Sequence, residues 1–154
     1  MQPFQPAAVA EAVVANAVNE ALKHGTHAML ATALVTNLAQ LRAMLKDSPG
    51  MVDLNAFDDA MARHHGKARK QDGSNPTNLA APSYEQNLVV RDSLQNALLM
   101  SASAEDNSIL AHYANALVVQ LAVHSGAEWP TIKAEIDRLS EDLEAPDSWS
   151  VSVH

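Results

Sequence analysis

The sequence predicts an all-α fold, a helical bundle of about five to six helices with an extended C-terminal arm. Apolar residues recur at helical spacing along several long segments, and capping or turn residues bound most of these segments. Alanine, the strongest helix former, supplies much of the 47% hydrophobic content. Two helical hairpins plus shorter helices would then share one core, in a single domain over residues 1–146.

The segment 103–124 has the widest apolar face and is expected to be the central helix. Its apolar residues form two adjacent rows: Ile109, Tyr113, Leu117 and Leu121, with Leu110, Ala114 and Val118 beside them. Ser103 or Asp106 can cap the start of this helix, and His124 followed by Gly126 fits its C-terminal end. A face this wide has to be covered on more than one side, so the other helices are expected to pack around it.

Two helices are expected in the first third of the chain. The first covers residues 7–24 and ends at Gly25, because glycine favours a helix stop. The second covers residues 26–46, with Thr26 as its N-cap. Its leucines repeat at steps of three and four residues, which is typical of a helix buried in a core or a coiled-coil seam.

The middle of the chain changes in composition after a short third helix. This helix is expected to start at Asp53 or Asn55 and to end at about His65. Residues 66–83 contain glycines, prolines and small polar residues without periodicity, so they are predicted to form a flexible loop. A loop of this length is unusual in a compact domain unless it has a purpose.

Two more helices are expected, one before and one after the central helix in the sequence. The first covers residues 84–102, with Ser83 and Gln86 at the spacing of a capping box and with the stem of Arg91 able to lie along the core. The last helix opens at Trp129-Pro130, because proline fits the first position of a helix.

The tail, residues 147–154, breaks the helical pattern. Trp149, Val151 and Val153 alternate with serines, and this period of two is typical of a strand. These three residues are the first candidates for partner binding, as an arm that docks on a neighbouring subunit or extends a partner's sheet. The alternative is a tail that lies across its own bundle or is frayed.

One basic cluster stands out in an acidic chain with a net charge of −8: Arg63, His64, His65, Lys67, Arg69 and Lys70. The overall charge disfavours a general nucleic-acid or membrane binder, since both need a broad basic surface. The cluster is the second candidate for partner binding, through Arg63, Lys67, Arg69 and Lys70, with phosphate, nucleic acid or an acidic protein patch as its target. The alternative is a solvated helix end that leads into the loop.

Little in the sequence predicts catalysis, and no cofactor or metal is expected. Cysteine is absent, which excludes disulfides and thiolate chemistry, and the seven histidines show no H-E-x-x-H pattern. His24, His64 and His124 are interpreted as cations near helix C-termini, and His112 as a residue that faces the core or a groove. No secretory signal or membrane-spanning segment is expected, which favours a cytoplasmic protein or part of an assembled particle.

These observations favour a non-enzymatic structural or assembly subunit that acts in a homo- or hetero-oligomer. Alanine-rich helical chains without cysteine and with extended ends occur among virus-particle and connector proteins, an analogy of composition alone. The alternative is a small acidic module that occupies a partner's basic surface, with acids clustered on one face of the last helix. A third hypothesis is an enzyme with a histidine-based site, in which His112 lies in a pocket beside an acid.

Overall fold

The computed structural model describes residues 5–48, 50–71, 81 and 83–144, and this part of the chain contains six α-helices and no strand. The predicted all-α bundle is therefore confirmed. The helices are α1 (Pro6–Ala21), α2 (His27–Lys46), α3 (Leu54–Gln71), α4 (Tyr84–Ala104), α5 (Ser108–His124) and α6 (Trp129–Glu144). Their buried apolar side chains form one continuous cluster.

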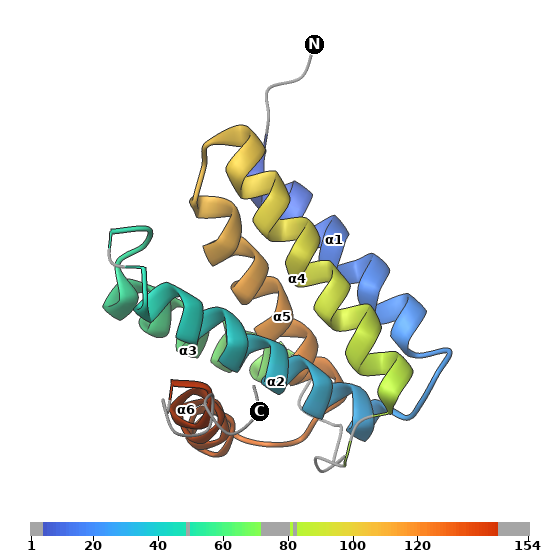
Figure 1. Cartoon of the computed structure of the whole chain (residues 1–154). Helices are drawn as coiled ribbons and strands as arrows, with labels where there is room; N and C mark the ends of the chain where they lie inside the picture. Colours follow the sequence, from blue (N-terminus) through green and yellow to red (C-terminus); the bar gives the residue numbers. More distant parts are fainter. Residues whose placement is uncertain (1–4, 49, 72–80, 82, 145–154) are drawn as a thin grey trace, which may run out of the picture.

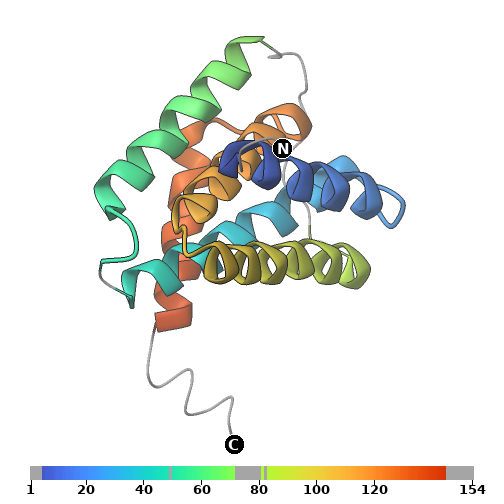
Figure 2. The same ribbon diagram turned by 90° about the horizontal axis from the view of Figure 1, so that it is seen from above.

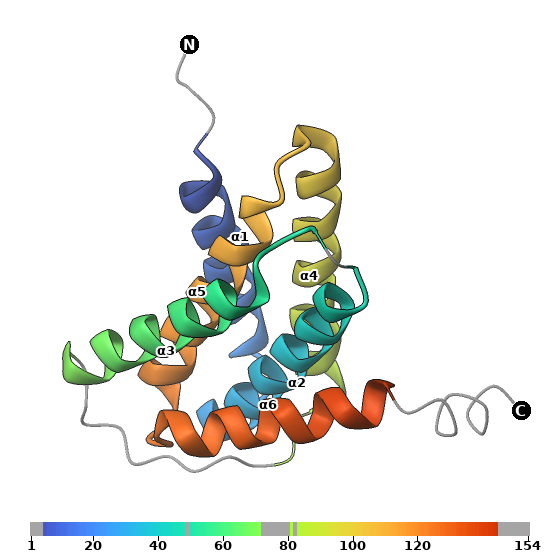
Figure 3. The ribbon, with the colours of Figure 1, turned by 90° about the vertical axis from the view of Figure 1, so that its left-hand side faces the viewer.

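Helix α5 is the centre of the bundle, as the width of its apolar face predicts. Helices α1, α2, α3 and α4 all pack against it, and α3 is seen crossing it in Figure 3. The large apolar side chains of both rows are inaccessible to solvent, and so is Tyr113. Because α5 is covered by four neighbours, the outward faces of those neighbours form most of the molecular surface around it (Figure 1).

The start of the central helix is a correction to the sequence prediction. Ser103 belongs to α4, which runs on to Ala104. Glu105 then adopts a left-handed backbone conformation (φ 52°, ψ 44°), which ends α4. The carboxylate of Asp106, the other predicted cap, accepts the backbone N–H of Ser108 at 3.0 Å and so satisfies a free donor in the first turn of α5.

The outer helices pack on α5 from different sides. Helices α1 and α4 lie side by side in Figures 1 and 2, whereas α2 packs against α4 and α5 and also against α6. The hydroxyl of Ser140 on α6 donates to the carbonyl of Ala39 on α2 at 3.2 Å. Arg42 on α2 holds Asp58 on α3 with two parallel hydrogen bonds of 3.0 and 2.8 Å, a geometry that fixes both side chains.

A chain of buried hydrogen bonds crosses the core from α2 through α5 to α4. Asn37 Nδ2 donates to the Tyr113 hydroxyl at 2.6 Å, and this hydroxyl lies 2.6 Å from Ser93 Oγ. Ser93 Oγ also lies within hydrogen-bonding distance of the carbonyl of Val90, which can accept its proton and leave Ser93 Oγ as an acceptor for Tyr113. Burial raises the pKa of Tyr113 to about 12, so the phenol keeps its proton at neutral pH.

The capping box at the start of α4 is confirmed. Ser83 Oγ accepts the backbone N–H of Gln86, and the Gln86 side chain accepts the backbone N–H of Ser83 in return. The amide of Gln86 also donates to the carbonyl of Thr26 at 3.2 Å, and it fits there because Gly25 has no side chain: a Cβ would lie 2.6 Å from the amide. Arg91 is exposed as a whole residue, and its side chain lines a surface pocket between α2 and α4.

The predicted loop at residues 66–83 is too long at its start, because α3 continues to Gln71. Residues 67–71 follow Gly66 with good helix formers, and Ala68 is buried. The sequence prediction gave Gly66 too much weight as a helix end. Residues 72–80 and 82 lie outside the described part of the chain.

Helix α2 is the one described helix that is long and apolar enough to cross a membrane by length and composition. Within its most apolar stretch, 61% of the residues are buried inside the bundle. This burial is typical of the core helix of a globular fold, and it agrees with the leucine repeat of the sequence.

Replacing Gly66 by alanine is expected to stabilise the protein. A methyl group there would meet no heavy atom within 4 Å, and the residue lies inside α3. Gly66→Ala should raise the free energy of unfolding by about 0.5–1 kcal/mol, because alanine loses less backbone entropy on folding. Urea unfolding of the two proteins measures this difference. A loss of stability would contradict a helix that runs through residue 66.

Candidate functional site

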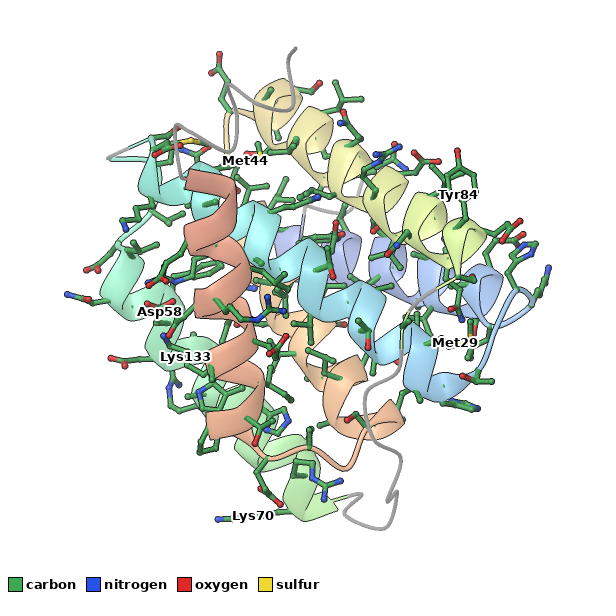
Figure 4. The ribbon with its side chains drawn as sticks, turned by 60° about the horizontal axis from the view of Figure 1, so that its bottom comes forward. Met29, Met44, Asp58, Lys70, Tyr84 and Lys133 are labelled. Carbon is green, nitrogen blue, oxygen red and sulfur yellow. The ribbon has the colours of Figure 1, made fainter. Side chains whose placement is uncertain are left out.

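Three of the predicted partner-binding residues form an exposed row on α3. Arg63, Lys67 and Lys70 are all exposed and lie four and three residues apart, which places them on one face of the helix. None of the three makes an ion pair with any residue that the structure describes. Figure 4 shows Lys70 pointing away from the bundle at its edge. We call these three residues the α3 cationic row.

The lack of ion pairs is unusual in this protein. Most other cations have an acid beside them: Lys23 with Glu20, Arg42 with Asp58, Arg69 with Glu128, Lys133 with Asp137 and Arg138 with Glu135. The chain offers 18 acids to 10 Lys and Arg residues, so acids are not scarce. The α3 cationic row therefore concentrates positive charge where the fold does not neutralise it.

Arg69, the fourth predicted residue of the basic cluster, does not join this row. Its side chain is only 15% exposed, and its guanidinium lies 3.5 Å from the carbonyl of Ser125 and 3.9 Å from a carboxylate oxygen of Glu128. Arg69 thus connects α3 to the segment between α5 and α6. Its Nε is buried without a hydrogen-bond partner.

A groove with two histidines lies next to the row. His64 from α3, His112 from α5 and Glu11 from α1 line it, together with small apolar residues of α1 and α5 and the side-chain amides Asn115 and Gln120 of α5. Its volume is about 320 Å³. Burial lowers the pKa of His64, and the positive charges of Arg63, Lys67 and His112 lower it further. His64 lies in the interior of α3, so its interpretation as a cation at a helix end is wrong. We call this feature the histidine groove.

The histidine groove is not a metal centre by geometry. Within the described ranges, no group of three or more histidine, aspartate or glutamate side chains is placed to hold a metal ion. The two histidines can still donate hydrogen bonds to an anion or exchange protons with it, whereas the carboxylate of Glu11 only accepts hydrogen bonds and repels an anion.

A second histidine pair ties the N-terminus of α2 to the C-terminus of α5. The Nδ1 atoms of His27 and His124 lie 2.7 Å apart, and the two rings are stacked with centroids 4.8 Å apart. His124 Nε2 lies 3.2 Å from Gln120 Oε1, so Nε2 donates to this acceptor. In a neutral His124 the Nδ1 atom is then the acceptor for His27. This arrangement gives His124 a hydrogen-bonding role in the fold.

The exposed surface of α4 is a feature that the sequence reading missed. Leu99 is 64% exposed and Met100 is 37% exposed, and residues 93–104 carry no charged side chain. The absence of charge over residues 93–104 could have revealed this surface, since an exposed helix of this length normally carries charged residues. We call the exposed part of this stretch the α4 patch: Gln95, Asn96, Leu99, Met100, Ala102, Ser103 and Ala104.

The predicted arm residues Trp149, Val151 and Val153 lie outside the described residues. The arm therefore stays a prediction. Comparison with protein-family models, with curated proteins and with solved structures gives no match for this chain.

Acidification is expected to destabilise the fold through His65 and His64. His65 is 1% exposed, packs against Trp129 and has a buried Nε2 without a partner; burial lowers its pKa, Arg69 lowers it further and Glu128 partly opposes this. Both histidines have folded-state pKa values below the ordinary 6.5, so the unfolded chain binds more protons. The free energy of unfolding should therefore fall as the pH drops through 6.5, until the folded-state pKa values are passed.

The variant His65→Phe tests the contribution of the buried ring. Phenylalanine keeps a ring beside Trp129 but does not titrate, so the variant should lose less stability between about pH 7.5 and about pH 5.5. Urea unfolding at the two pH values gives the slope. An unchanged slope would show that His65 does not contribute.

Proposed function

We propose that the protein is a non-enzymatic assembly subunit that associates with copies of itself through the α4 patch. One observation carries this proposal: three of the four exposed large apolar side chains in the described residues, Tyr84, Leu99 and Met100, lie on α4. Single exposed apolar residues are normal in monomers. Two neighbours in a surface stretch without charge are the pattern expected at the centre of an interface.

The chemistry of the α4 patch suits contact between helices. Ala102 and Ser103 are small and let a second helix approach closely, while Gln95 and Asn96 can hydrogen-bond across the contact. Fully burying a side chain such as Leu99 contributes about 1.5–3 kcal/mol. The uncharged stretch of 12 residues, 93–104, is about 18 Å long, enough for several turns of contact.

The net charge favours this face for contact between two copies. Each copy has a net charge of −8, so most approaches bring like charges together. The α4 patch is bounded by Asp92 and Glu105 but contains no charge itself. Two copies that meet there with two-fold symmetry would keep these acids at the rim, in contact with water.

The C-terminal arm belongs to the same proposal as a second contact. Trp149, Val151 and Val153 would add apolar anchors that dock on a neighbour once two bundles have met. In an assembled particle, both the α4 patch and the C-terminal arm would contact neighbouring subunits.

The contacts of α6 give less support to the alternative hypothesis of a small acidic binding module. It needs a face of free acids on this helix, but Glu135 pairs with Arg138 and Asp137 pairs with Lys133. Both acids are thus at least partly neutralised on their own helix. The enzyme hypothesis is favoured by one observation, that His112 and Glu11 line the same groove.

The mass in solution tests the proposal. Sizing chromatography with light scattering should give a mass above 16.5 kDa for the full chain, and Leu99→Glu should shift it toward 16.5 kDa by placing a charge in the interface. Met44→Glu is the matched control, because Met44 is 43% exposed on α2, outside the α4 patch.

Truncation separates the two contacts. A chain that ends at residue 146 should keep its helix content but assemble more weakly if the arm contributes. A full chain that is already a monomer, or a Leu99→Glu variant with the mass of the parent, would contradict the proposed role of α4.

A further inference from the structure

We infer that the α3 cationic row and the histidine groove together form a binding site for a phosphate monoester with an apolar body. This inference is independent of self-association through α4. It rests on three cations on one helix face of an acidic protein that have no ion pair among the described residues, beside a groove lined by histidines and apolar side chains.

The helical positions place the row and the groove next to each other. At about 100° per residue, Arg63, Lys67 and Lys70 lie within about 60° of one another around α3. His64 lies about 60° from Lys67 on the side of the groove. A phosphate bound between Arg63 and Lys67, one helical turn apart, would therefore be within reach of a histidine at the mouth of the groove.

The helix dipole does not explain the row. A dipole favours cations in the last turn of a helix, which accounts for Lys70 in α3. Arg63 lies eight residues before the end of α3 at Gln71, about two turns away, where the dipole has little effect. Three like charges at these spacings repel each other. An anion that binds between them reduces this electrostatic repulsion.

The walls of the histidine groove define the rest of the ligand. Val14 and Ala15 of α1 and Ala116 and Val119 of α5 supply apolar lining for a short alkyl group, and Asn115 and Gln120 of α5 add polar lining. A volume of about 320 Å³ lies at the lower end of the range for small-molecule sites, so the apolar group is short.

Glu11 fixes the orientation of the ligand. It is the single acid among the residues that line the histidine groove, and it comes from α1, whereas the cations come from α3. A dianionic phosphate is repelled by Glu11 and attracted by Arg63 and Lys67, so it binds at the α3 side with its apolar body pointing inward. Among the described residues that line the groove there is no tryptophan, tyrosine or phenylalanine to stack on a base, and this disfavours a nucleic acid as the ligand.

The test uses hexyl phosphate as the soluble probe, with inorganic phosphate and hexanol as the two halves of its chemistry. Titration calorimetry of the full chain should show saturable binding of hexyl phosphate that is tighter than that of inorganic phosphate. Arg63→Gln/Lys67→Gln should weaken binding by about tenfold or more, because two charge-assisted contacts are lost. Glu11→Gln should tighten binding, because it removes the repelling charge.

Arg91→Gln is the matched control. Arg91 is exposed, makes no ion pair with a described residue and is the sole cation of α4, so its loss changes the net charge without changing the row. Binding that is weakened equally by Arg91→Gln and by a single Arg63→Gln change would show a general charge effect and overturn the inference. Circular dichroism confirms that each variant is folded.

Two sources of this ligand chemistry can be distinguished with vesicles. Phosphatidylcholine vesicles with and without phosphatidic acid present the same phosphate monoester on a lipid. Binding that needs phosphatidic acid and is lost in Arg63→Gln/Lys67→Gln assigns the site to a headgroup, and binding of hexyl phosphate alone assigns it to a free metabolite. Absence of saturable binding to both probes overturns the inference.

Discussion

The burial of the wide apolar face of α5 is the constraint on which the rest of the structure depends. Four helices pack against it, and the chain of hydrogen bonds from Asn37 through Tyr113 to Ser93 joins α2, α5 and α4 at its centre. Apolar contacts alone tolerate small sliding motions between helices, whereas moving Tyr113 away from Asn37 and Ser93 would break buried hydrogen bonds at a cost in free energy. Tyr113 therefore fixes how α2 and α4 are placed on the central helix.

This placement decides which surfaces are free to act. With Ser93 turned inward on α4, the exposed residues of its last turns, including Leu99, are left outside the core. On α3, buried Phe57 and Met61 face the core, which leaves Arg63, Lys67 and Lys70 on the outside. The two proposed sites are thus the outward faces of helices whose inward faces pack against α5. Neither site requires a conformational change.

The fold could be predicted from the sequence more fully than the sites. Periodic apolar rows and the Ser83–Gln86 box marked helices correctly, because packing and capping are local in sequence. Gly66 led to a wrong end for the third helix, because α3 continues through this glycine. Ser103 led to a wrong start for the central helix, because α4 ends only at the left-handed residue Glu105. The histidine groove could not be predicted, since its walls come from three helices far apart in the sequence, and Arg69 turns inward for the same tertiary reason.

A double-mutant cycle on Tyr113 and Ser93 tests the central claim most directly. If the hydrogen-bond chain fixes α4 on α5, Tyr113→Phe should cost about 1–3 kcal/mol of unfolding free energy, since it leaves buried partners unpaired. Ser93→Ala should then cost much less in the Tyr113→Phe background than in the parent, with a coupling energy of about 0.5–3 kcal/mol. Strictly additive effects would show that the two hydroxyls act separately and would contradict the account.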